Sequence, residues 1–340
     1  MKKLLKIVLL LNICTVLSPL LAVGFSAEAP VELLEPNTAV LEIGLTLPER
    51  TSYDETTLVR LCAEGSVREL PLKDYLVGVL AAEMPAGFPE EALKAQAVAA
   101  RTYTLYKMAL YSGQAELPAE HQGADLCDDP GHCEAFVDLT AQAGALWGDS
   151  ADIYRQRLET AVEDTDGMIL VYEEQPIAAV FCAASTEKTE SAADIWGSDL
   201  PYLQSVDSPG GSDCSRYEDT VTIKHSDFRD AILAMAPEAD FSGAPGTWFR
   251  DSHRSAAGSV IDVLVGEARL TGSQVRQAAG LNSANFKVKV DGENLVFTTL
   301  GYGHGVGLSQ YGARYLAMDG QTYDQILAHY YPGTQLRLEG

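Results

Sequence analysis

The chain has 340 residues, enough for one large domain or two ordinary ones. Hydrophobic residues make up 46% and charged residues 21%, a composition typical of an ordered globular protein. The 48 acidic residues against 24 Lys and Arg give a formal net charge of −24. This balance argues against a nucleic-acid-binding protein, because affinity for nucleic acid depends on basic contacts to phosphates. It is compatible with a neutral or cationic partner, and equally with a plain solvated acidic surface.

The N-terminus departs from this acidic character. Three lysines within the first six residues precede an apolar run from Ile7 to Val23. A basic segment followed by an apolar one is typical of a signal peptide or an N-terminal membrane anchor, here residues 1–27. Either would carry residues 28–340 across a membrane. We expect an anchored protein with an extracytoplasmic region, and a secreted protein if the segment is cleaved.

Export changes how the six cysteines are interpreted. Five of them lie beyond the apolar run, an odd number with no regular spacing. A disulfide scaffold therefore describes this chain poorly. The pattern assigns no role to Cys62, Cys182 or Cys214.

The first strong helical pattern ends at Glu83. Apolar side chains recur there at steps of three and four residues: Leu72, Tyr75, Leu76, Val79 and Leu80. Glu83 is the next member of this apolar stripe, and burial disfavours an ionised carboxylate, so we expect its pKa to be raised. A protonated carboxyl near neutral pH is what glycosidic bond cleavage requires as its proton donor. The alternative is a partly buried Glu paired with a nearby Arg or Lys.

A second helix is predicted to begin after Pro89 and to run to about Met108. Its Arg101 lies on an otherwise apolar face. A Pro- and Gly-containing turn separates this helix from the first, so the two form a predicted helical hairpin. Arg101 and Glu83 could then meet as oppositely charged partners.

Residues 116–138 are polar and contain Gly and Pro, which predicts a loop. The loop contains two histidines and two cysteines within thirteen residues: His121, Cys127, His132 and Cys133. These are the ligands of a closed tetrahedral zinc site, which would be structural because four protein ligands leave no open position. A disulfide between the two cysteines, plain surface histidines, or a site using only some of the four are the alternatives.

Helices and strands alternate in the rest of the chain. Predicted helices are Ile153–Asp164, Ser226–Met235 with Ser226 as N-cap, and Gly272–Ala279; predicted strands are Met168–Tyr172, Ile177–Cys182 and Ser259–Val265, followed by a hairpin of Phe286–Val290 and Leu295–Thr299. This mixture predicts an α+β fold, in which the helical hairpin packs with mixed or antiparallel β elements. Residues from about 215 to 300 are a possible β-rich subdomain.

Two polar segments are candidates for ligand contact. Residues 301–307 contain four glycines, a density that lets backbone approach a ligand or forms a tight strand-to-helix turn. The segment from Ser185 to Tyr202 offers hydroxyls, carboxylates and two aromatic rings, which suit sugar recognition or an ordinary capped loop. Neither Ser309 nor Cys182 has a His and an acid nearby in sequence, so a hydrolase triad is not supported.

Taken together, these segments resemble the stage II sporulation protein D family, peptidoglycan lytic transglycosylases that also include proteins called amidase enhancers. The resemblance covers about residues 70 to 335. It rests on these blocks: Ala82-Glu83-Met84-Pro85, Glu91 to Tyr103, Thr189-Glu190, Trp196-Gly197, Leu200-Pro201-Tyr202, Gly303 to Gln310, and His329 to Thr334.

The resemblance implies that Glu83 is the catalytic acid and base, and that Arg101 lies in the same cleft. It also implies zinc in some members, with ligands spaced like His121, Cys127, His132 and Cys133. Further residues are expected to line the substrate groove: Ser185, Lys188, Thr189, His304, Ser309 and Gln310. This chain departs from the family at Phe181-Cys182, where members usually have Phe-His, and at Thr186-Glu187, where they favour Gly-Gly or Asn-Gly.

The resulting hypothesis is a membrane-anchored lytic transglycosylase that cleaves peptidoglycan between N-acetylmuramic acid and N-acetylglucosamine and leaves 1,6-anhydro ends. By resemblance it would act in engulfment during sporulation, on strands first stripped of peptides by an amidase. Its expected partners are the glycan strands, that cell-wall amidase and a membrane scaffold of the engulfment machinery. The alternative is a glycan-binding protein that activates an amidase without cutting the glycan itself.

Overall fold

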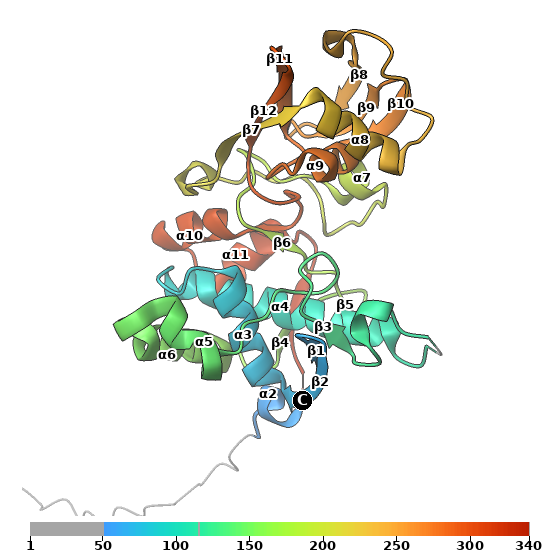
Figure 1. Ribbon diagram of the computed structural model, residues 1–340. Helices are drawn as coiled ribbons and strands as arrows, with labels where there is room; N and C mark the ends of the chain where they lie inside the picture. Colours follow the sequence, from blue (N-terminus) through green and yellow to red (C-terminus); the bar gives the residue numbers. More distant parts are fainter. Residues whose placement is uncertain (1–50, 115, 340) are drawn as a thin grey trace, which may run out of the picture. The chain divides into compact units, whose positions relative to one another are not determined.

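The computed structural model describes residues 51–114 and 116–339 (Figure 1). The expected anchor, residues 1–27, lies outside the described residues. Among the helices of the described ranges, none combines the length and apolar character needed to cross a bilayer. Contacts place the described ranges in one compact unit, Arg50–Gly340.

The predicted α+β fold class is confirmed, with helices and mostly antiparallel strands in the same unit. The helices are α2 (Tyr53–Thr56), α3 (Leu72–Glu83), α4 (Glu90–Tyr111), α5 (Leu139–Trp147), α6 (Ala151–Glu163), α7 (Ala192–Trp196), α8 (His225–Met235), α9 (Gly272–Ala279), α10 (Gln310–Met318) and α11 (Tyr323–Tyr330). The strands are β1 (Leu58–Ala63), β2 (Ser66–Pro71), β3 (Leu126–Cys127), β4 (Met168–Tyr172), β5 (Gln175–Pro176), β6 (Phe181–Cys182), β7 (Glu218–Lys224), β8 (Phe249–Arg254), β9 (Val260–Val265), β10 (Ala268–Thr271), β11 (Phe286–Asp291), β12 (Asn294–Leu300), β13 (Leu308–Ser309) and β14 (Gln335–Leu338).

The strands form several small sheets. Their orders are β2-β1-β3, β14-β4-β5, β13-β6, β11-β12-β7 and β10-β9-β8. Only two pairs in the described residues are parallel, β1 with β3 and β6 with β13, and each spans two residues. The predicted hairpin is present as β11 and β12, whose antiparallel register runs from Phe286 opposite Thr299 to Asp291 opposite Asn294.

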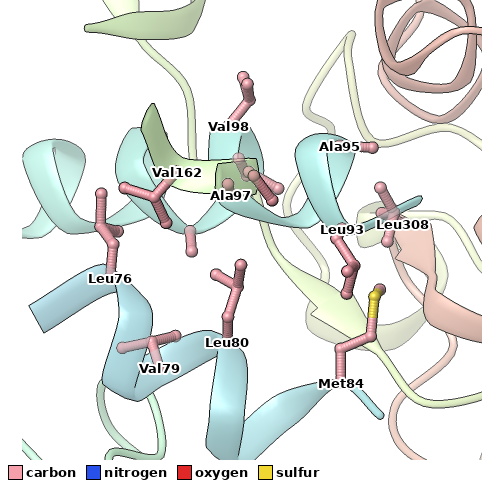
Figure 2. Packing of buried hydrophobic residues seen from close by; sticks show 14 of the residues in the cluster. Leu76, Val79, Leu80, Met84, Leu93, Ala95, Ala97, Val98, Val162 and Leu308 are labelled. Carbon is pink, nitrogen blue, oxygen red and sulfur yellow. The ribbon is translucent and has the colours of Figure 1, made fainter. Parts of the chain in front are cut away.

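The larger hydrophobic core forms where α3 packs on α4 and α6 (Figure 2). Figure 2 shows Leu80 of α3 in this layer together with Ala97 of α4 and Val162 of α6, and all three are fully buried. Burying such side chains contributes on the order of 1.5–3 kcal/mol each for the larger aliphatic ones. The apolar stripe that predicted α3 is therefore the face that fixes it to the rest of the core.

A glycine lets residues 134–137 lie directly on α3. These residues follow the two histidines and two cysteines of the loop 116–138, which we call the Cys/His loop. A Cβ at Gly78 would come within 2.3 Å of the Phe136 ring and 2.7 Å of the Val137 carbonyl oxygen. The Val137 amide donates to the Gly78 carbonyl at 3.2 Å. This close approach brings residues 134–137 alongside the helix that ends at Glu83.

A second, separate cluster of buried residues lies within residues 228–297. Phe228 of α8, Val275 of α9 and Phe297 of β12 are all fully buried in it. The capping box of Thr271 and Gln274 begins α9, and Gly280 in the left-handed region ends it. We refer to residues 218–300 as the β-rich lobe.

Most predicted elements are present, with shifted ends. Helix α4 continues three residues beyond the predicted Met108. The predicted N-cap at Ser226 is wrong, because α8 begins at His225 and its N-cap is Lys224. Of the predicted strand Ile177–Cys182, only Phe181–Cys182 pairs, and the loop of residues 116–138 contains a 3₁₀ turn (Ala119–His121) and β3.

The expected contact between Arg101 and Glu83 is wrong. Arg101 is fully buried, and its Nε donates to Asp54 Oδ1 at 2.8 Å. The same guanidinium donates to the carbonyls of Val162 and Met168, each at 3.1 Å. The charge on the apolar face of α4 is therefore neutralised by a carboxylate on the short helix α2 and not by Glu83.

We predict that Arg101→Met lowers the free energy of unfolding by about 3–5 kcal/mol, because it leaves a buried carboxyl without its partner. Urea unfolding followed by circular dichroism measures the change. Arg229→Met, which removes the same charge from an exposed position, should change stability by no more than about 0.5 kcal/mol. A loss below about 1 kcal/mol for Arg101→Met would show that the pair does not hold these elements together.

Candidate functional site

Glu83 is the last residue of α3. The helix ends there because Met84 precedes Pro85 and a residue before proline disfavours the helical region; Met84 adopts an extended conformation, with φ −124° and ψ 136°. The Glu83 side chain is partly buried, and its Oε1 accepts a hydrogen bond from the Ala135 amide at 3.2 Å.

Glu83 lines a cleft of about 780 Å³. The size is typical of a ligand-binding pocket. The cleft takes its walls from α3, α4, the segment after β3, β6, α7, α9, the glycine-rich segment and the start of α10. The polar and aromatic residues in its lining are Glu83, Tyr103, His132, Cys133, Glu134, Phe181, Cys182, Trp196, Arg276, Tyr302, His304 and Gln310.

The pKa of Glu83 is raised, as expected. Burial is the main cause, and the Ala135 amide and the Gln310 side chain oppose it. The Gln310 side chain is itself buried, and its amide lies beside the carboxyl. The carboxyl therefore retains its proton to a higher pH than an exposed Glu would, although two neighbouring donors favour its ionised form.

A second carboxyl, Glu134, lies deeper in the same wall. Burial raises its pKa to about 8. Its Oε2 accepts hydrogen bonds from Thr104 Oγ1 at 2.9 Å and from the Tyr75 hydroxyl at 3.3 Å. No sequence pattern pointed to Glu134, because it follows the Cys/His cluster in an irregular segment.

The residues expected in the groove are divided between the cleft and the interior. His304 and Gln310 line the cleft. Ser185, Thr189 and Ser309 are buried and form internal hydrogen bonds: Ser185 Oγ to Ser208 Oγ at 2.6 Å, Thr189 Oγ1 to the Gln204 carbonyl at 3.3 Å, and the Ser185 amide to Ser309 Oγ at 3.2 Å. Lys188 is exposed and forms an ion pair with Asp207. Arg101 is absent from the lining of the cleft.

The glycine run acts through its backbone conformation. Gly301, Gly303, Gly305 and Gly307 have φ angles of 84°, 113°, 81° and 73°, which other residues adopt only with strain. A Cβ at Gly307 would come within 2.1 Å of the Val180 carbonyl oxygen. The run thus packs against the segment around β6 and presents His304 to the cleft.

His304 is neutral at physiological pH. Burial, and then the charge of Arg276, lower its pKa to about 4. Its Nδ1 accepts from the Val306 amide at 3.0 Å, which leaves the proton on Nε2. Its ring lies 5.2 Å from that of Trp196, which is 45% exposed and offers an aromatic face to the cleft.

Cys182, at which the resemblance implies a histidine in other members, is also on the cleft wall. Cys182 is buried there, and burial raises the pKa of its thiol to about 12, so it is uncharged. A neutral thiol is a weak hydrogen-bonding group, so this chain lacks the polar contact that an imidazole would make at that position.

The Cys/His cluster brings its four side chains together. One potential ligand atom from each of His121, Cys127, His132 and Cys133 lies within 4.8 Å of the other three. His121 Nε2 is 3.3 Å from Cys133 Sγ, and His132 Nδ1 is 3.4 Å from Cys127 Sγ. Both cysteines are free thiols, so the alternative of a disulfide is not what the structure contains.

This donor set could hold a metal ion. Burial raises the pKa of Cys133 to about 12, so a thiolate there requires a nearby cation. The outer nitrogen of His132, Nε2, lies 3.3 Å from the Tyr111 hydroxyl, an arrangement that orients a ligating imidazole. The cluster is next to Glu83, because the amide that binds its carboxylate belongs to Ala135, two residues after Cys133.

Comparison with known proteins gives consistent matches. Residues 63–172 match the family described as stage II sporulation protein. Stage II sporulation protein D of Bacillus subtilis (strain 168) is 37% identical over 274 residues, which are 81% of this chain and 76% of that protein. The protein of the same name from Bacillus amyloliquefaciens is 36% identical over 80% of this chain and 75% of its own length. The amidase enhancer of Bacillus subtilis is 27% identical over 77% of this chain and 40% of its own length.

We predict that Glu83→Gln becomes more stable than the wild type as the pH rises. The folded wild type keeps the Glu83 proton to a higher pH than the unfolded chain, so it loses stability as the pH rises from about 4.5 through the folded pKa. The glutamine does not titrate. Urea unfolding of both proteins between about pH 4 and pH 8 measures the difference in their free energies of unfolding. This difference should be smallest near pH 4, grow as the pH rises, and level off above the folded pKa of Glu83. A difference independent of pH would mean that the carboxyl is not destabilised by burial.

Proposed function

Because the chain belongs to the stage II sporulation protein D family, we propose that its extracytoplasmic region is a peptidoglycan lytic transglycosylase with Glu83 as its acid. Membership makes it a sporulation protein related to an amidase enhancer. The observation that carries the finer proposal is a partly buried carboxyl with a raised pKa in a cleft of about 780 Å³.

The reaction requires one group that first gives and then takes a proton. Glu83 donates its proton to the glycosidic oxygen as the bond from C1 of N-acetylmuramic acid to that oxygen breaks. The 6-hydroxyl of the same sugar then forms a new bond to C1, and its proton passes to Glu83. The attack is intramolecular and therefore favoured by proximity, and no water is consumed.

The surroundings of Glu134 favour this route over hydrolysis. A hydrolytic glycosidase needs a second carboxylate that acts as nucleophile or base. The only other acid in the lining of the cleft is Glu134, which is buried and engaged by Thr104 and Tyr75. With a pKa of about 8 it is mostly protonated at neutral pH, which makes it a poor nucleophile.

Three further side chains fit sugar binding. Trp196 offers an aromatic face on which a sugar ring can stack, as apolar sugar faces pack on indole. His304 contributes an uncharged ring to the lining, and Gln310 contributes an amide beside Glu83. Together they would position the sugars on either side of the scissile bond.

We also propose the cellular setting. Residues 1–27 would anchor the protein, and residues 28–340 would reach peptidoglycan strands whose peptides an amidase has removed. That amidase and a membrane scaffold of the engulfment machinery are the proposed partners. The cofactor would be one structural zinc ion held by His121, Cys127, His132 and Cys133.

We predict that the purified region releases fragments with 1,6-anhydro ends from peptide-free glycan strands, and that Glu83→Gln reduces their yield by a factor of about 10³ or more. Mass spectrometry of the digest measures the ends. Glu238→Gln, an exposed change away from the cleft, should retain the wild-type yield.

Two results of that digest would contradict the catalytic proposal. A wild type that yields no anhydro ends, yet binds the strands and stimulates an amidase, would favour a non-catalytic activator. An unchanged yield from Glu83→Gln would place the acid elsewhere.

We predict that the purified protein contains one zinc ion per chain and that Cys127→Ser loses it. The yield of anhydro products should also fall when the zinc is lost, because the zinc fixes the loop that places the Ala135 amide against Glu83. Elemental analysis and the digest give both readouts. Cys214→Ser, a buried cysteine outside the cluster, should keep its zinc; a wild type without zinc would overturn the assignment.

A further inference from the structure

Arg276 is the one arginine or lysine in the lining of the cleft. It lies on α9, in the β-rich lobe, and is partly exposed. Its Nε donates to the Leu281 carbonyl at 3.2 Å, which fixes the side chain near the end of its own helix. Within the described ranges, its two terminal amino groups make neither a hydrogen bond nor an ion pair, so they are available to a ligand.

A neighbouring arginine shows the contrast. Arg216 donates to the Tyr302 hydroxyl at 2.7 Å and to Asn282 Oδ1 at 3.1 Å, and its guanidinium lies 4.4 Å from the centre of the Tyr302 ring. Both of its terminal amino groups are thus used within the protein. Arg276, by contrast, lies on the wall of the cleft with its outer donors unused, an arrangement suited to binding a ligand.

The electrostatic setting favours an anion at Arg276. Burial lowers the pKa of Arg276 and so marks a charge that is held partly out of water. His304 beside it is neutral. A partly desolvated guanidinium gains most from a carboxylate, which it binds through two parallel hydrogen bonds. The chain as a whole carries −24 charges, so an anionic ligand needs such a local cation to enter the cleft.

The glycan itself supplies a carboxylate of the right kind. The lactyl group of muramic acid ends in a free carboxylate when no peptide is attached, and in an uncharged amide when a peptide is present. We propose that Arg276 binds this lactyl carboxylate and thereby selects strands from which the peptide has been removed. This inference rests on the proposed function. That function already includes prior hydrolysis of the muramyl amide bond, and Arg276 is the contact that would enforce this order.

A binding experiment separates this inference from the catalytic proposal. The Glu83→Gln protein binds glycan without turnover. It is titrated calorimetrically with peptide-free glycan fragments, and with the same fragments after conversion of the lactyl carboxylates to methylamides. We expect the carboxylate fragments to bind at least about tenfold more tightly, as for a charge-assisted bidentate contact.

Adding Arg276→Gln should remove this preference and leave methylamide affinity unchanged. Adding Arg229→Gln, which makes the same charge change at an exposed position of the β-rich lobe, should retain it. Arg276→Lys keeps the charge but not the planar fork, so we expect a smaller preference that is still present. It also provides a folded variant if the loss of the Leu281 contact unfolds Arg276→Gln, which thermal denaturation reports.

Equal binding of the two ligands by Glu83→Gln, no binding of either, or equal weakening of both by the Arg276 variants would overturn the inference. Failure of the proposed function has a different signature, because wild type that produces no anhydro ends leaves this binding preference intact.

Discussion

One buried guanidinium joins the elements on which the site depends. Arg101 of α4 contacts Asp54 of α2, the Val162 carbonyl of α6 and the Met168 carbonyl of β4. A guanidinium has its donors fixed in one plane, so four segments must take up one relative position to satisfy it. Helix α3 packs on α4 and α6 in this arrangement, and Glu83 is its last residue. The position of the proposed acid is therefore set by a charge that it does not touch.

Burial favours the uncharged forms of the acids and of His304 in the cleft. It raises the pKa of Glu83, raises that of Glu134 to about 8, and lowers that of His304 to about 4, and each change favours the neutral form. Arg276 differs because a guanidinium keeps its proton in proteins. Arg276 is the one arginine or lysine in the lining, so it supplies a permanent positive charge to the cleft. A neutral sugar can bind to the rest of the wall, while an anionic group is attracted to Arg276.

The helices were predictable where one face is apolar, because the residues that pack in the core then recur with the period of a helix. The stripe of α3 that ends in Glu83 and the face of α4 that contains Arg101 are examples. The partner of Arg101 was not predictable, since Asp54 lies 47 residues earlier in a helix of four residues that has no periodicity. The Cys/His cluster was predictable as a group, because its members are close in sequence and their chemistry is distinctive.

Residues brought to the cleft by tertiary structure left no local signal. Arg276 belongs to a segment with its own hydrophobic core, and no spacing relates it to Glu83. Conversely, the hydroxyls of Ser185 and Ser309 have the composition of a binding loop, but the structure uses them in its own hydrogen bonds. A polar motif indicates that hydrogen bonds form nearby, and only the fold decides whether their partner is the protein or a ligand.

The Ala135 amide gives the Cys/His loop a part in the proposed chemistry. Burial raises the pKa of Glu83, and the hydrogen bond from Ala135 is the larger of two donor contributions that lower it. The hydrogen bond from Ala135 therefore limits how far burial raises the pKa of the proposed acid. A group that serves as acid and then as base needs an intermediate pKa. The loop that carries Ala135 has little regular structure of its own, so the ion that would bind its cysteines and histidines would also maintain that hydrogen bond.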